Sequence, residues 1–156
     1  MRAGWHWRHG KGRAMDIRDT VLRFMGEDVF AVGAGMEIVE LEAGRSRVRM
    51  PVTTRVLNGH GVVHGGALFT LADYAGAAAV NGLGRRSMAA GGTISFLKPT
   101  RSGTLTADAV VERGGRTLAT VLVRVTNEKN ELVALFQGTA FRTEEELGAA
   151  AGNLKV

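Results

Sequence analysis

The stretch that most constrains this chain is residues 65–81, GGALFTLADYAGAAAVN, a run of helix formers that is apolar on most faces. It opens on a Gly-Gly pair and closes at NGLG, whose glycines act as stop signals, so the pattern predicts one helix over about residues 65–81. A helix that is apolar nearly all round is buried on more than one side. The rest of the chain must therefore provide a surface that wraps around it.

Strand patterns flank this helix on both sides. Before it, MEIVELEAGRSRVRMPV alternates polar and apolar residues about an Ala43-Gly44 turn, which predicts a hairpin. After it, strand-like runs occupy about residues 87–97, 103–112, 117–127 and 131–142, and the RGGR sequence is typical of a hairpin turn. A short amphipathic helix is expected in MDIRDTVLRFMGED. This order indicates an α+β fold with an antiparallel, five- to six-stranded sheet wrapped around a long central helix.

Length and charge suggest one folded domain with flanking segments. We expect a basic, disordered leader over residues 1–15, a domain over 16–143 and a tail over 144–156, with Met15 as an alternative start. Residues 1–14 hold four of the 20 basic residues and none of the 15 acidic ones, so the remainder has a net charge of only +1. No nucleic-acid motif accompanies the basic leader, and we expect no nucleic-acid partner.

The chain contains no cysteine, which excludes disulfides, zinc–cysteine sites and thiol catalysis and is consistent with a cytoplasmic protein. Thr70, Asp73 and Tyr74 interrupt the apolar run in residues 67–80, so no membrane segment is expected. The leader lacks an apolar region behind its basic residues, and we expect no secretory signal. Neither a G-x-S-x-G elbow nor a P-loop or dinucleotide fingerprint is present.

Histidines and an aspartate stand in and before the central helix. His60 and His64 have the spacing of a helical zinc motif, but no glutamate follows His60 and no third ligand is evident, so we expect no metal. Asp73 is a carboxylate within a run that periodicity assigns to the core. It is either a structural carboxylate bonded to backbone amides or a functional one.

Residues 57–99 contain NGHGVVHGGALFTLAD and, further on, TISFLKP. This pattern resembles the hotdog-fold acyl-CoA thioesterases, especially the PaaI-like members of phenylacetate breakdown, and the likeness extends over about residues 36–142. The resemblance implies a homodimer with one continuous sheet, often paired into a tetramer. It also implies cleavage of an aryl-acyl (phenylacetyl-like) or medium-chain acyl-CoA without a metal or other cofactor.

Thioester hydrolysis must stabilise the charge that develops on the carbonyl oxygen and must activate water or supply a nucleophile. The amide of Gly65 at a helix N-terminus is a natural oxyanion donor, and a glycine there lets the substrate approach. Asp73 lies eight residues further on, roughly 12 Å along the same helix. If both groups act on one thioester, they must come from different subunits, which predicts an obligate dimer with two composite sites.

Asp73 is expected to act as a general base on water or as a nucleophile through a mixed anhydride, and the sequence leaves both open. Burial should raise its pKa, whereas nearby amide donors would oppose that shift. By resemblance, Asn58 helps position the attacking water or the thioester carbonyl, and His64 supports Asn58 and the loop. On local grounds alone, Asn58-Gly59 and the Gly65-Gly66 pair also suit ordinary turns.

Further substrate contacts are expected from Gly66, Thr93 and Ser95. Some relatives carry a Ser or Thr one turn after the acid or on the next strand; here those positions are Ala77 and Ala89-Ala90, which leaves Thr93 and Ser95 as the nearest hydroxyls in the sequence. Arginines suit the phosphates of coenzyme A. The basic residues that fall in predicted turns are Arg85, Arg86, Lys98, Arg101, Arg113 and Arg116, of which Arg113 and Arg116 are taken as substrate-binding candidates.

Two rival functions fit the same fold. A non-catalytic acyl-CoA-binding protein would bind the thioester without releasing coenzyme A. A hotdog enoyl-CoA hydratase or dehydratase would need a histidine paired with a carboxylate. His64 and Asp73 are nine residues apart, so such a pair would also have to form across a dimer.

Overall fold

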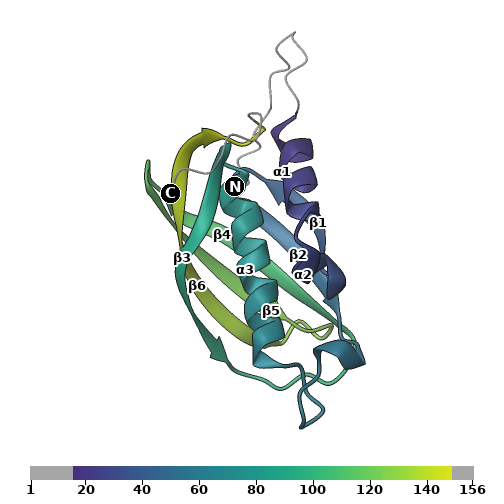
Figure 1. The fold of residues 1–156 in the computed structure, drawn as a ribbon. Helices are drawn as coiled ribbons and strands as arrows, with labels where there is room; N and C mark the ends of the chain where they lie inside the picture. Colours follow the sequence, from purple (N-terminus) through teal and green to yellow (C-terminus); the bar gives the residue numbers. More distant parts are fainter. Residues whose placement is uncertain (1–15, 149–156) are drawn as a thin grey trace, which may run out of the picture.

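A long helix crosses the concave face of a curved sheet in the computed structural model, which describes residues 16–148 (Figure 1). The sheet has six antiparallel strands in the order β1-β2-β4-β5-β6-β3. Two short helices lie beside the long one in Figure 1. The elements are α1 Ile17–Gly26, α2 Val29–Gly33, β1 Glu37–Glu42, β2 Arg45–Pro51, η1 Thr54–Val56, α3 Gly65–Asn81, β3 Arg85–Phe96, β4 Thr104–Gly114, β5 Leu118–Thr126 and β6 Leu132–Glu146.

This is the hotdog arrangement that the resemblance implies, and the predicted central helix matches α3 residue for residue. The short helix α2 was not predicted from the sequence. β6 continues to Glu146, beyond the expected domain end at residue 143, because its last residues still pair with β3. The expected leader, residues 1–15, and the end of the expected tail, residues 149–156, lie outside the described residues.

The core lies between α3 and the sheet, and small residues let the two layers approach closely. A Cβ on Gly76 of α3 would lie 3.1 Å from a methyl group of Val121 on β5. On the sheet, the ring of Phe136 fills the space over Gly92 and Gly138, where added Cβ atoms would lie 2.6 and 2.7 Å from it. No helix among residues 16–148 is long and apolar enough to cross a bilayer.

β3 and β1 form the two edges of the sheet, and the β3 edge is unusually exposed. Ser87 is the one buried residue of β3, and most of its other residues are exposed. An exposed edge strand presents a row of unpaired backbone N–H and C=O groups that can pair with another chain. The sheet therefore offers one long edge for extension.

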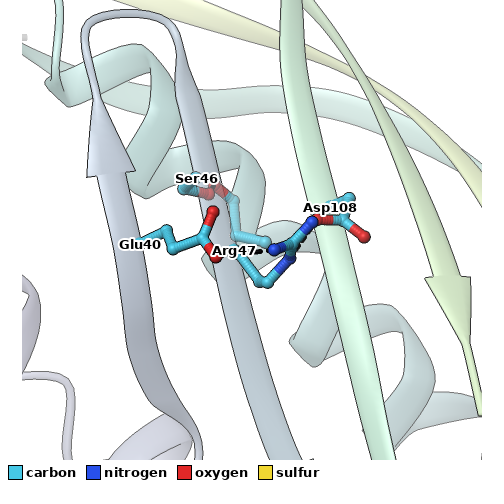
Figure 2. A network of polar contacts seen from close by, with 5 residues as sticks. Glu40, Ser46, Arg47 and Asp108 are labelled. Atoms are coloured by element: carbon cyan, nitrogen blue, oxygen red, sulfur yellow. Dashed lines mark hydrogen bonds and ion pairs between the residues drawn. The ribbon is translucent and has the colours of Figure 1, made fainter. Parts of the chain in front are cut away.

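On the outer face of the sheet, at the end formed by β1, β2 and β4, charged side chains connect neighbouring strands. Arg47 on β2 contacts Glu40 of β1 through Nη1 and Asp108 of β4 through Nε, each at 2.6 Å (Figure 2). The hydrogen bond and charge of Asp108 raise the pKa of Arg47. On the inner face, Ser46 Oγ donates to the carbonyl of Ala75 in α3 at 2.6 Å, which fixes the sheet to the helix.

Candidate functional site

The N-terminus of α3 is capped so that one backbone donor stays available. Nδ1 of His64, the N-cap residue, accepts a hydrogen bond from the amide of Gly66 at 2.8 Å. The amide of Gly65, one residue earlier, has no hydrogen-bond partner among the described residues. A free N–H at a helix N-terminus, together with the helix dipole, is suited to stabilise negative charge.

Both glycines at this helix start have close neighbours, and neither has a positive φ angle. A Cβ on Gly65 would lie 3.0 Å from Cζ of Phe96 at the end of β3. A Cβ on Gly66 would lie 3.0 Å from Nδ1 of His64. The interpretation of this pair as an ordinary strained turn is therefore not supported, because neither residue has the backbone conformation that favours glycine.

Asn58 organises the loop that leads into α3. Its Oδ1 accepts hydrogen bonds from the amides of His60 at 2.9 Å and Val62 at 3.3 Å. Its Nδ2 donor has no partner among the described residues. The expected support of Asn58 by His64 is not seen as a hydrogen bond, since His64 instead caps α3 and donates its backbone N–H to Val56 at 2.7 Å.

Arg101 holds the same loop from outside. Its Nη1 donates to the carbonyl oxygens of His60 at 2.9 Å and Gly61 at 3.3 Å. The adjacent Thr100 accepts the backbone N–H of Val63 at 2.8 Å. The loop before Gly65 is therefore attached to the β3–β4 connection at several points.

Asp73 is half-buried and lacks partners. Its carboxylate forms no hydrogen bond or ion pair with any described residue, so the structural alternative, a carboxylate bonded to backbone amides, does not describe it. Burial raises the pKa of Asp73, and the negative charge of Asp28 adds to the shift. An unpaired, partly desolvated carboxylate with a raised pKa is typical of a functional group.

A small pocket opens beside Asp73, between α3 and the paired strands β3 and β6. Its volume is about 30 Å³, enough for about two water molecules but too small for an aryl-acyl group. Ala77 lies in its wall one helical turn after the acid, where no hydroxyl is available. Ser87 and Thr139 also line it, so they are the hydroxyl-bearing residues that share the pocket with Asp73.

Thr93 and Ser95 are placed on the other face of the sheet. Gly92 faces the core through its contact with Phe136, and side chains alternate along a strand, so Thr93 and Ser95 point away from α3. The structure therefore does not bring them together with Asp73 in one subunit. The hydroxyls that line the Asp73 pocket of the same chain are those of Ser87 and Thr139, because strand pairing and side-chain alternation, not sequence distance, decide which strand residues face it. Substrate contacts of Thr93 and Ser95 stay predictions.

Arg113 and Arg116 lie in and beside the β4–β5 hairpin turn, at the end of the sheet away from Gly65. Arg113 is exposed, and Arg116 makes a solvent-exposed ion pair with Glu144 at 3.4 Å. Neither contacts Gly65 or Asp73. Within residues 16–148, no three acidic or histidine side chains gather in a way that could hold a metal ion.

Gly65 and Asp73 belong to one helix, so their separation along its axis is about 12 Å. One thioester is too small to contact both groups of the same chain. The sequence analysis did not predict the contacts of three residues near these groups: Phe96 at Gly65, Arg101 at the loop and Asp28 near Asp73. Phe96 stands in the TISFLKP pattern and Arg101 in a predicted turn, but only the folded chain brings them to these positions.

Comparisons with known proteins identify relatives of this chain and of its fold. A family model of the Thioesterase superfamily matches residues 60–134. Acyl-coenzyme A thioesterase PaaI of Escherichia coli (strain K12) is 40% identical over 116 residues, covering 74% of this chain and 83% of that protein. The solved structure of the E. coli PaaI protein from the phenylacetic acid degradation operon matches with a TM-score of 0.78 and 34% identity, over 84% of this chain and 99% of that one.

A second solved structure gives the same result. A mutant of the phenylacetic acid degradation protein PaaI from Thermus thermophilus matches with a TM-score of 0.71 and 36% identity. The match covers 74% of this chain and all (100%) of that one.

Proposed function

The chain belongs to the thioesterase superfamily, as a PaaI-like thioester hydrolase of the hotdog fold, and on that premise we propose that it hydrolyses an aryl-acyl (phenylacetyl-like) or medium-chain acyl-CoA to the free acid and coenzyme A. The observation that carries this proposal is Asp73, a half-buried carboxylate without a partner among the described residues, which lines a pocket of about 30 Å³. A group kept unpaired in this way is available for a reacting water or carbonyl.

In the proposed reaction, Asp73 removes a proton from a water molecule while the oxygen of that water bonds to the thioester carbonyl carbon. The π electrons of the carbonyl move to the carbonyl oxygen, and the N–H of Gly65 stabilises the resulting oxyanion. The C–S bond then breaks, and the sulfur leaves with its electron pair as the thiolate of coenzyme A. In the alternative route, the Asp73 carboxylate attacks the carbonyl carbon and the C–S bond breaks, which releases the thiolate of coenzyme A and leaves a mixed anhydride. Water then hydrolyses the anhydride to the free acid and the Asp73 carboxylate.

We propose that the Gly65 amide and the Asp73 carboxylate of one site come from two subunits. The separation of about 12 Å along α3 supports this, because a two-fold axis would place the start of one helix near the middle of the other. The exposed β3 edge supports it as well, since two such edges can pair into one continuous sheet. The small single-chain pocket is then completed by the partner. Pairing of two dimers into a tetramer is a further part of this proposal.

The positions of Asn58 and His64 support auxiliary roles. Asn58 uses its oxygen to shape the loop and keeps Nδ2 for the attacking water or the thioester carbonyl. His64 positions the helix start through its bond to Gly66. The same bond engages Nδ1 of His64, so in a hydratase Nε2 would have to pair with the carboxylate of another subunit.

Release of free thiol from a panel of acyl-CoAs tests the proposal. Asp73→Asn should lower kcat/KM at least about a hundredfold, as expected for loss of a general base or nucleophile. Asp19→Asn on the exposed face of α1 is a matched control and should leave the rate unchanged. Equal rates in wild type and Asp73→Asn would remove Asp73 from the mechanism. Tight binding without thiol release would instead identify a non-catalytic acyl-CoA-binding protein.

A further inference from the structure

Arg142 on β6 is a partly buried cation without a carboxylate partner among residues 16–148. Its Nη1 donates to the carbonyl of Gly115 at 2.6 Å, but its Nε is buried and has no hydrogen-bond partner there. Burial lowers the pKa of Arg142, and the like charge of Arg85 adds to the shift. A partly buried guanidinium with an unpaired N–H is stabilised when an anion completes its surroundings.

Three arginines near this pocket have no carboxylate partner in the described part of the chain, although ion pairs of Arg86 with Glu145 and of Arg116 with Glu144 lie at the same end of the sheet. Arg45, Arg85 and Arg142 form no ion pair with any described residue, although Glu42 and Glu146 are strand neighbours of the first two. Residues 1–15 and 149–156 contain neither Asp nor Glu. The charge of Arg142 is therefore available to an anion from solution or to a bound molecule.

A surface pocket of about 430 Å³ adjoins this guanidinium, and we call it the arginine pocket. It lies among the β1–β2 turn, the residues after α3 and the ends of β4 and β6. Its walls are Arg45 and Arg142 together with Gly44, Leu83, Val111 and Gly114. Guanidinium groups bind phosphate oxygens with two parallel hydrogen bonds, so the pocket is chemically suited to a phosphate group.

In the other basic pocket on the sheet, an arginine is already paired with carboxylates. It is lined by Arg47 and Arg49, but Arg47 already contacts Glu40 and Asp108 at 2.6 Å each (Figure 2). Likewise, Arg116 contacts Glu144. Among the described arginines, Arg142 combines burial, a free N–H and a neighbouring pocket without a competing carboxylate.

The arginine pocket also lies within reach of the proposed reaction centre. Leu83 in its wall follows the C-terminal end of α3, and Asp73 lies about 12 Å before Asn81 on that helix. The extended pantetheine arm that joins the thiol of coenzyme A to its phosphates exceeds this length. A thioester at Asp73 can therefore place a phosphate of the same molecule near Arg142.

We propose that the arginine pocket binds a phosphate group of coenzyme A, with Arg142 as its principal ligand and Arg45 and Arg85 as flanking cations. This inference rests on the proposed function for the location of the thioester. It assigns the phosphate contact to Arg142 on β6 instead of to Arg113 and Arg116 on the hairpin. Arg142 is then a substrate-binding residue that acts on affinity for coenzyme A and not on bond cleavage.

Two substrates with the same acyl group test this proposal: the acyl-CoA and its N-acetylcysteamine thioester, which has no phosphates. Arg142→Gln should raise KM for the acyl-CoA about tenfold or more, as expected for loss of a charge-assisted contact. It should leave kcat/KM for the N-acetylcysteamine thioester within about twofold of wild type. Arg124→Gln, which removes an exposed charge on β5 outside the pocket, is the matched control and should change neither value.

An equal loss on both substrates, or no change on either, would overturn the proposal, because it would show a structural role or none. If Arg142→Gln does not fold, the proposal is tested by the same two-substrate comparison in Arg45→Gln and by inhibition of the wild-type enzyme. Adenosine 3′,5′-bisphosphate should then compete with the acyl-CoA and leave hydrolysis of the N-acetylcysteamine thioester unaffected. If wild type releases thiol from neither substrate, the proposed function fails, and titration of the bisphosphate into wild type and Arg142→Gln tests the pocket alone.

Discussion

The ring of Phe96 at the end of β3 lies against Gly65 at the start of α3, so that a Cβ on Gly65 would come within 3.0 Å of Cζ. The contact brings an exposed aromatic side chain of the sheet edge to the helix N–H that has no partner among the described residues. It follows that any side chain at position 65 must share its space with Phe96. The hydrogen-bond donor of Gly65 and the space left by its missing side chain can be tested separately by two substitutions.

Gly65→Pro removes the proposed oxyanion donor, whereas Gly65→Ala adds a Cβ and retains the N–H. Proline suits the first position of a helix, and His64 before it already has φ −62° and ψ 138°, as a residue before proline requires. We expect kcat of Gly65→Pro to fall about 100- to 1000-fold below that of Gly65→Ala. Circular dichroism checks that both variants keep the helix. Equal kcat values for the two would exclude the amide from the mechanism.

The pH dependence of kcat/KM should report the raised pKa of Asp73. In the proposed mechanism only the ionised carboxylate can act as base or nucleophile, so activity should rise with pH through a midpoint above the ordinary value of 3.8. Asp28→Asn should move that midpoint to lower pH, because it removes the like charge that helps to raise the pKa of Asp73. Asparagine retains the oxygen that accepts the Ala31 amide at 2.9 Å and caps α2.

Glu27→Gln is the control for that measurement, because it removes a neighbouring exposed carboxylate that does not shift the pKa of Asp73. Its acid midpoint should equal that of wild type. A midpoint that stays in place in Asp28→Asn would show that Asp28 does not influence Asp73.

Thermal unfolding should show that the ionised Asp73 carboxylate lowers the stability of the folded chain. Because its pKa is raised in the folded state, ionisation favours unfolding: the penalty is absent below pH 3.8, grows as pH rises and is complete above the raised pKa. Asp73→Asn should therefore increase Tm at pH 7 by on the order of 2 °C. The increase should shrink as the pH is lowered toward the ordinary pKa of 3.8. A lower Tm than wild type at pH 7 would indicate a structural role for the carboxylate.

Arg101 should act as a positioning residue for the loop before α3. Arg101→Ala loses the hydrogen bonds to the carbonyls of His60 and Gly61, so we expect kcat to fall about tenfold with little change in KM. Arg101→Lys keeps one donor and should recover part of that loss. The free energy of unfolding should change by about 1 kcal/mol or less. Unchanged kcat in Arg101→Ala would contradict this role.

The fold could be predicted in outline because its local patterns are strong. The apolar run of α3 has glycines at both ends, and the later strands alternate with a period of two, which defines the helix and the sheet. The helix α2 was missed because five residues carry too little periodicity to be recognised. The end of β6 was missed because its three consecutive glutamates resemble an exposed tail, and pairing with β3 determines their conformation.

The candidate site could be proposed from the sequence where it follows a motif, but not where it depends on three-dimensional packing. Asp73, Gly65 and Asn58 stand in one contiguous segment with a recognisable pattern. Ser87 and Thr139 reach the pocket only because β3 and β6 pair, with an irregularity in the register between Ala89 and Gly91. The same pairing turns Thr93 and Ser95 to the outer face, a consequence that sequence distance does not reveal.

The most direct test of the shared site is activity in mixed dimers of Asp73→Asn and Gly65→Pro, made by co-expression of differently tagged chains. Each parent homodimer should be nearly inactive. In the heterodimer, one composite site contains both substitutions and the other contains none, so we predict about half of the wild-type activity per dimer. A heterodimer as inactive as its parents would show that Gly65 and Asp73 do not act together across a subunit interface and would contradict the account.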